Sequence, residues 1–160
     1  MPDLRDVVVL EDETLEFDFG WVIFYNTEAF AKGQNWRDTL VGNAPFIVDR
    51  TTGQLFQTGT AQPIEVYVGA YKRYGDPHAR PGKGVRVSGW DTGALAVSAI
   101  KVVRARSGSS LTEAKRCVEQ VLNGGSASFE ADSVDAAAAA VNELHACGFR
   151  AEQLRDARAA

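Results

Sequence analysis

Short apolar runs separated by turns dominate the N-terminal half of the chain and predict strands there. Gly20 to Tyr25 is one apolar run, and Pro45 to Asp49 is another. Side chains alternate along a strand, and both faces of the first run are apolar, so we expect that strand to be covered on both sides. Residues 50–53 predict a turn and Gln54 to Thr60 a returning strand, with Gly53 where a hairpin needs positive φ.

Further elements flank this hairpin. Val7 to Leu10 and the acidic segment after it predict a strand or hairpin, and Pro63 to Tyr74 has an amphipathic pattern. We expect Trp21 to anchor the core. Trp36 and Arg37 stand in a polar stretch and are candidate partner contacts, because tryptophan and arginine dominate binding hot spots. A minor packing role for Trp36 is the alternative.

A segment rich in proline and glycine divides the chain. Residues 76–84 neither continue a helix nor make a good strand, so they predict a linker between a domain of residues 1–75 and a domain of residues 85–160. The second domain predicts the order β-α-α-β-α-β, with elements at 84–90, 93–106, 111–122, 128–131, 135–146 and 149–154. Ser110 and Glu113 have the spacing of a capping box. The fold class is α+β, with an antiparallel sheet and helix in the first of two small domains.

Charge differs between the two halves. Residues 1–75 hold eleven acidic and six basic side chains, a net charge of −5, whereas the rest has a net charge of +1. The total of −4 argues against nucleic acid as the main partner. The acids gather between Asp3 and Asp18, which indicates either a solvated edge or a surface for a basic partner. No apolar run approaches the roughly 20 residues of a membrane helix, and no secretory signal pattern begins the chain, so we expect a cytoplasmic protein.

The sequence contains no candidate catalytic site. Cys117 and Cys147 lack metal-ligand spacing and predict reduced, half-buried thiols. His145 and Cys147 are two positions apart on a predicted helix and do not face each other, which argues against a nucleophile pair. We therefore expect no enzyme activity, no metal and no cofactor.

An ordered series of short motifs runs through the first 75 residues: Gly20-Trp21-Val22, Phe24-Tyr25, Gly42-Asn43-Ala44-Pro45, Val48-Asp49, Thr52-Gly53 and Gly59-Thr60. The series resembles the YrhB-like group, also called the immunity protein 35 family. That resemblance implies stoichiometric inhibition of a cognate bacterial toxin by direct protein binding. It also implies a second possibility, since YrhB-like proteins are linked with chaperone-like behaviour.

The second half carries a different motif, Ile100-Lys101-x-Val103-Arg104-x-x-Ser107-Gly108-x-x-Leu111-x-Glu113-Ala114-Lys115. With the element order, it resembles the C-terminal domain of the bacterial ribosomal stalk protein, which contacts translational GTPases. The resemblance implies the contact residues Val97, Ile100, Lys101, Arg104 and Lys115. Ala96 and Ser110 depart from that pattern, and simple solvation of an amphipathic helix is the alternative. We expect a non-catalytic immunity protein, with a translational-GTPase-binding protein and a chaperone as alternatives.

Overall fold

The structure is a computed structural model that describes residues 6–157. The chain divides into two compact units, with the boundary between His78 and Ala79. Mixed helices and antiparallel sheets make the fold class α+β, as predicted. No helix in the described residues is long and apolar enough to cross a membrane.

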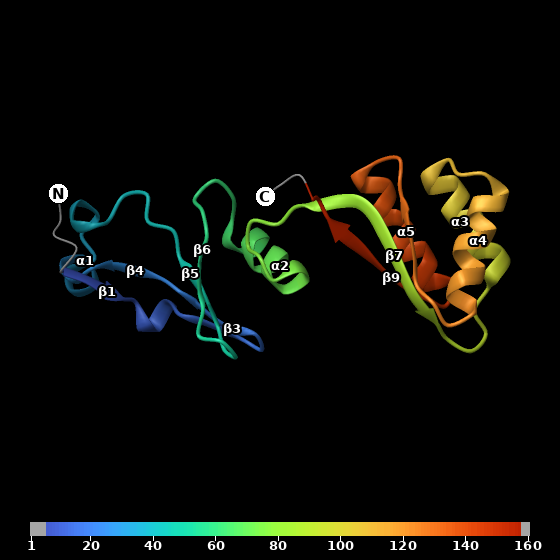
Figure 1. Ribbon diagram of the computed structural model, residues 1–160. Helices are drawn as coiled ribbons and strands as arrows, with labels where there is room; N and C mark the ends of the chain where they lie inside the picture. The colour runs from blue at the N-terminus through green and yellow to red at the C-terminus, as the bar shows by residue number, and fades with distance from the viewer. Residues whose placement is uncertain (1–5, 158–160) are drawn as a thin grey trace. The chain divides into compact units, whose positions relative to one another are not determined.

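Two antiparallel sheets form the first unit (Figure 1). One sheet has the strand order β2-β3-β5-β6, and β1 pairs with β4 in the other. The strands are β1 (Val7–Val9), β2 (Leu15–Phe17), β3 (Gly20–Ile23), β4 (Tyr25–Thr27), β5 (Phe46–Asp49) and β6 (Leu55–Gln57). The helices are α1 (Glu28–Gly33) and α2 (Ile64–Tyr74), and Glu11–Glu13 and Trp36–Asp38 are single 3-10 turns.

Helix α2 covers one face of the four-stranded sheet. Val22 and Ile47 of adjacent strands are fully buried there against Val68 and Tyr71 of the helix. This apolar cluster is the core of the first unit, and it uses the side chains of alternate positions on each strand.

The predicted strand over Gly20 to Tyr25 is interrupted. β3 ends at Ile23, opposite Phe46, and Tyr25 begins a strand in the other sheet. The next residue of β5 would be Pro45, which has no N–H to continue the ladder. The carbonyl of Phe24 instead accepts a hydrogen bond from the N–H of Leu10 at 2.9 Å.

Trp21 is not a core residue, contrary to expectation. It lies beside Val48 on the face opposite Val22, where it is half-buried. Leu55, the next residue in that row, is 63% exposed. The prediction that both faces of this strand are covered is therefore wrong for the row that contains Trp21.

The hairpin itself agrees with its prediction, except that its second strand is short. Gly53 has φ of 70° in the turn, where a side chain would strain the backbone. β6 ends at Gln57, and the hydroxyl of Thr58 then donates to the carbonyl of Pro45 at 2.6 Å. The returning strand predicted to reach Thr60 thus stops where its partner reaches a proline.

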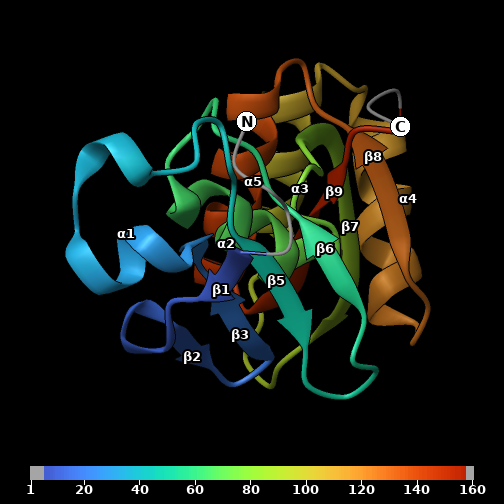
Figure 2. The ribbon, with the colours of Figure 1, turned by 90° about the vertical axis from the view of Figure 1, so that its left-hand side faces the viewer.

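The second unit has the predicted order of elements. β7 (Pro81–Trp90) is the middle strand, between β8 (Ala127–Glu130) and β9 (Phe149–Arg155). The helices α3 (Ala96–Ser107), α4 (Leu111–Leu122) and α5 (Val134–Ala146) pack on one face of this sheet (Figures 1 and 2). Val85 and Val87 point into that core, and Arg86 and Ser88 are exposed, as the alternation predicts.

Residues 81–84 do not belong to a linker, contrary to expectation. β7 begins at Pro81, and proline is tolerated as the first residue of a strand. The side chain of Gln153 donates to the carbonyl of Gly82 at 2.8 Å, and the N–H of Asp156 donates to the carbonyl of Arg80 at 2.8 Å. These contacts come from the far end of the chain, and they fix a segment whose composition suggested a flexible connection.

Local signals at the helix ends also appear in the structure. Ser110 and Glu113 form the capping box of α4, and the Ser133 side chain accepts from the N–H of Ala136 at the start of α5. Cys117 and Cys147 are free and half-buried, and burial raises the pKa of the Cys117 thiol.

Candidate functional site

The segment after α1 presents an exposed tryptophan. Trp36 is 74% exposed on the 3-10 turn Trp36–Asp38, and the Asn35 side chain caps that turn by accepting from the N–H of Arg37 at 3.1 Å. The guanidinium carbon of Arg37 lies 5.5 Å from the centre of the Trp36 ring. The two candidate residues of this unit therefore lie together on the surface, a placement that suits partner binding.

Asn26 anchors this segment to strand β4. Its buried side chain donates to the hydroxyl of Thr39 at 2.9 Å and accepts from the N–H of Leu40 at 2.8 Å. The neighbouring Thr27 hydroxyl donates to the carbonyl of Asp38 at 2.5 Å. Asn43 closes the segment by donating to the carbonyl of Tyr25 at 2.7 Å. The last residue of the exposed turn and the segment that follows it are thus held by β4.

A cleft of about 630 Å³ opens beside the turn. Its lining includes Glu28 and Lys32 of α1 and Arg37 and Asp38 of the turn. Glu28 and Lys32 form an ion pair at 2.5 Å, and the hydrogen bond from Lys32 lowers the pKa of Glu28. Side chains of both charges line the cleft, so it is suited to polar contacts with a protein surface. Within residues 6–157, no group of His, Cys, Asp and Glu side chains is arranged to hold a metal ion.

Replacing Asn26 by alanine is expected to loosen the exposed turn. The change removes the side-chain amide, so the N–H groups of Leu40 and Thr27 lose their acceptor and the hydroxyl of Thr39 loses a donor. A buried polar group left unpaired costs about 1–3 kcal/mol, so urea denaturation should show a loss of about 2 kcal/mol. Asn142→Ala, at an exposed position of α5, is the matched control and should change stability by less than about 0.5 kcal/mol. Equal losses in the two variants would contradict this anchoring role.

The candidate residues of the second unit lie on two faces of α3 and on α4. Val97 is 68% exposed, and Lys101 and Arg104 continue the same exposed stripe of α3. Ile100 is half-buried against the core, so it lies off this stripe. Lys115 is exposed on α4 and pairs with Glu119 at 3.6 Å.

The sequence reasoning missed an apolar surface of the first unit. Trp21, Ile23, Phe46, Val48 and Leu55 lie on the face of the four-stranded sheet opposite α2, and we call them the outer sheet face. Alternation along each strand was the signal that separates them from the core positions.

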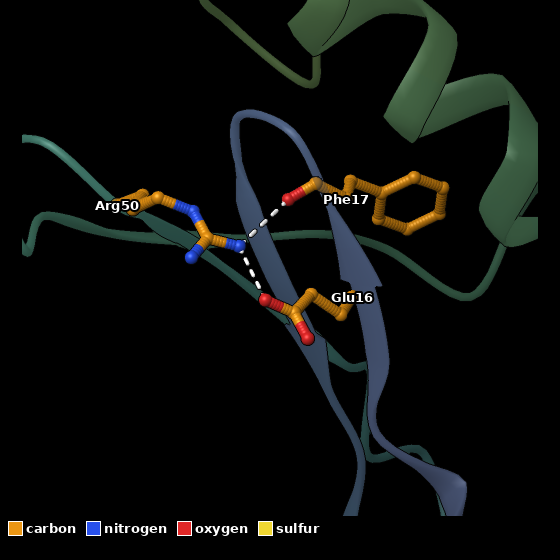
Figure 3. A network of polar contacts seen from close by, with 3 residues as sticks. All are labelled: Glu16, Phe17 and Arg50. Carbon is orange, nitrogen blue, oxygen red and sulfur yellow. Dashed lines mark hydrogen bonds and ion pairs between the residues drawn. The ribbon is translucent and has the colours of Figure 1, made fainter.

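Arg50 lies across this face. Its guanidinium carbon is 4.3 Å from the centre of the Trp21 ring. The same side chain donates to Glu16 at 2.6 Å and to the carbonyl of Phe17 at 3.0 Å. Figure 3 shows both contacts as dashed lines. The pair of opposite charges ties the turn after β5 to strand β2.

Several residues of the motif series have structural roles. Gly20 packs so closely on β5 that a Cβ would lie 1.9 Å from the carbonyl oxygen of Val48. Asp49 accepts from the N–H groups of Thr51 and Thr52, both at 2.8 Å, and from the hydroxyl of Tyr71 at 2.6 Å. These contacts join the hairpin to α2. Gly20, Asp49 and Thr52 of the motif series therefore have structural roles that involve no partner.

Acid should weaken the contact between Asp49 and Tyr71. The Tyr71 hydrogen bond, with help from the Thr52 N–H, lowers the pKa of Asp49 from 3.8 to about 2. A lowered pKa gives stability that is complete above pH 4 and is lost as the pH falls towards 2. We therefore expect the folding stability of the wild type to fall between pH 4 and pH 2, and to fall less in Asp49→Asn. Acid titrations followed by circular dichroism measure this loss, with Asp12→Asn as the control that should behave as the wild type does. The expectation is wrong if the two variants lose stability equally.

At alkaline pH, the contribution of Tyr71 to folding stability is lost as the pH rises. Burial, and then the hydrogen bond to Asp49, raises the pKa of Tyr71 from 10.0 to about 12. The stability that this phenol contributes is therefore present below pH 10 and is lost as the pH rises to about 12.

Comparison with known proteins assigns the first unit to a family. Residues 2–70 match the family described as immunity protein 35. The chain is also 34% identical over 70 residues to the uncharacterized protein YrhB of Escherichia coli (strain K12), and the match covers 44% of this chain and 71% of that protein. Neither match supports the resemblance of the second half to the ribosomal stalk protein. By the family match and by its identity over most of this relative, the chain belongs to the immunity protein 35 family.

Proposed function

We propose that this protein is a non-catalytic immunity protein of the cytoplasm that neutralises a cognate bacterial toxin by direct binding, without a cofactor. The observation that carries the proposal is the coincidence of two features in one unit. Residues 2–70 match an immunity family, and the same unit presents Trp36 at 74% exposure on an anchored turn. An anchored aromatic side chain loses little conformational freedom on binding, which favours affinity.

Inhibition in this mechanism is steric and electrostatic. The first 75 residues carry a net charge of −5, which attracts a basic partner and speeds its association. A standard interface buries about 800 Å² on each partner, an area that a unit of this size can offer. The bound immunity protein covers the active surface of the toxin, so no chemical step is required of its own residues.

Co-expression with the product of the neighbouring gene tests this function. We expect a stable one-to-one complex and relief of growth inhibition. Trp36→Ala should weaken the complex at least about tenfold, since truncating a hot-spot residue costs 2 kcal/mol or more. Trp90→Ala, at a 42% exposed position of the second unit, is the matched control and should bind as the wild type does. Recovery of only ribosomes, elongation factors or mixed unfolded proteins would reject the immunity function.

The second candidate function is binding of a translational GTPase. Its support is the exposed stripe of Val97, Lys101 and Arg104 on α3. Binding through this stripe should be sensitive to salt and should be lost in a Lys101→Glu, Arg104→Glu double variant. Arg116→Glu, at an exposed position of α4, is the control. A chaperone-like activity would instead protect unrelated proteins from aggregation, and the double variant would leave that protection unchanged.

A further inference from the structure

The outer sheet face is an apolar surface arranged in rows. Trp21, Val48 and Leu55 lie opposite one another on β3, β5 and β6, and Ile23 lies opposite Phe46. Leu55 is 63% exposed and the other four side chains are half-buried. Neighbouring side chains on one face of a sheet form a rigid surface, because the strands fix their spacing.

This surface continues onto the two-stranded sheet. The ring of Tyr25 on β4 stacks on Phe46 with the ring centres 5.4 Å apart. Val9 of β1 lies opposite Tyr25 and is 50% exposed. The apolar stripe therefore runs from Leu55 to Val9 across both sheets. The stripe contains Trp21 and Tyr25, and Arg50 lies over the Trp21 ring. Trp, Tyr and Arg are the residue types most enriched among binding hot spots.

Unpaired acids border one end of the stripe. Val9 and Leu10 line a cleft of about 350 Å³ together with Glu11, Asp12 and Glu13. Within the described part of the chain, these three carboxylates form no ion pair. At the other end, Arg50 is already paired with Glu16 at 2.6 Å. The unpaired charge beside the stripe is therefore negative.

We propose that the outer sheet face, extended through Tyr25 and Val9, is the docking surface for a basic protein partner. The proposal rests on the proposed immunity function and names the surface that the toxin covers. Apolar side chains of the partner contact the stripe, and a lysine or arginine enters the acidic cleft. Its aliphatic stem packs on Val9, and its cationic end meets Glu11 to Glu13. A second copy of this chain would bring the same unpaired acids to the contact, so charge favours a different protein.

Two pairs of matched variants test the surface in the full-length chain, with the product of the neighbouring gene as the probe. Leu55→Lys and Val9→Lys place a charge on the stripe. Leu111→Lys and Val66→Lys, at positions that are 55% and 52% exposed, place the same charge elsewhere. We expect the first pair to raise Kd at least about tenfold and the second pair to change it less than about twofold. Thermal melting should show all four variants folded, since each changes an exposed side chain.

The acidic cleft has its own test. Neutralising Glu11, Asp12 and Glu13 together, by Glu→Gln and Asp→Asn changes, should slow association and flatten its dependence on salt. Neutralising Glu113, Glu119 and Glu130 of the second unit is the control and should leave the salt dependence unchanged.

The possible outcomes distinguish failure of the docking surface from failure of the immunity function. A complex that Trp36→Ala weakens and that Leu55→Lys and Val9→Lys leave intact keeps the immunity function and overturns the docking surface. A wild-type dimer in sedimentation that Leu55→Lys dissociates assigns the surface to a second copy and also overturns the proposal. Absence of any complex with the neighbouring product overturns both the function and the surface.

Discussion

Gly20→Ala is expected to unfold the first unit under conditions in which the wild type is stable. A Cβ at this position would lie 1.9 Å from the carbonyl oxygen of Val48 and 3.0 Å from the backbone nitrogen of Arg50. Both atoms belong to backbone, so no side-chain rotation relieves the contact, and φ of 150° is itself unfavourable for alanine. We expect a loss of about 3 kcal/mol or more, measured by guanidinium denaturation.

Hydrogen exchange should place this loss in strands β3 and β5, where Gly20 pairs with Asp49. Gly69→Ala provides the control in the same unit. Gly69 lies inside α2 with open space at its Cβ position, and alanine there should add up to about 1 kcal/mol of stability. If both glycine variants lost stability equally, close packing would not be the reason for glycine at position 20.

Phe149→Ala should have the largest effect in the second unit. Phe149 is 2% exposed at the start of β9 and belongs to the core cluster beneath the three helices. Truncating a buried phenylalanine removes its packing and leaves a cavity, at a cost of about 3–5 kcal/mol. The measurement is thermal and chemical denaturation of the full-length chain, with hydrogen exchange to locate the weakened strands.

Phe129→Ala serves as a graded comparison for this prediction. Phe129 of β8 packs against the same core but is only half-buried. The smaller area removed from the core should make its loss clearly smaller than that of Phe149→Ala. A larger loss from Phe129→Ala would show that the core is centred elsewhere.

Local sequence signals predicted most of the second unit. Alternation along β7 and the capping box of α4 each involve residues a few positions apart. The start of α3 was predicted three residues too early, at residue 93 rather than Ala96. The N–H of Leu95 donates to the carbonyl of Cys147 at 2.8 Å, a contact between distant segments that leaves no local pattern.

The first unit was harder to predict because its key contacts are not local. Asn26 bonds to Thr39 and Leu40, and nothing in the sequence marks one asparagine as their anchor. Trp21 was expected to anchor the core, but its side chain alternates with that of Val22 and lies on the outer sheet face. Strand alternation decides between the two faces only when the neighbouring strands are known.

For the candidate site, the polar context of Trp36 left a surface contact and a minor packing role open, and its 74% exposure favours the surface position. Helical spacing also placed Val97, Lys101 and Arg104 on one stripe, whereas Ile100 turned towards the core. Whether these residues contact a partner remains a prediction. Pairing across three strands creates the outer sheet face, so no single segment of sequence contains it.

The central position of β7 has a consequence for synthesis of the protein. β7 is the first strand of the second unit to leave the ribosome, but both of its partners, β8 and β9, are translated later. Until β8 and β9 are translated, neither edge of this ten-residue strand has a partner within its own unit. Pro81, Lys83 and Arg86 lie in this strand, and proline and charged side chains discourage pairing with other unfinished chains. We therefore expect these residues to limit aggregation of the nascent protein until β9 has been translated.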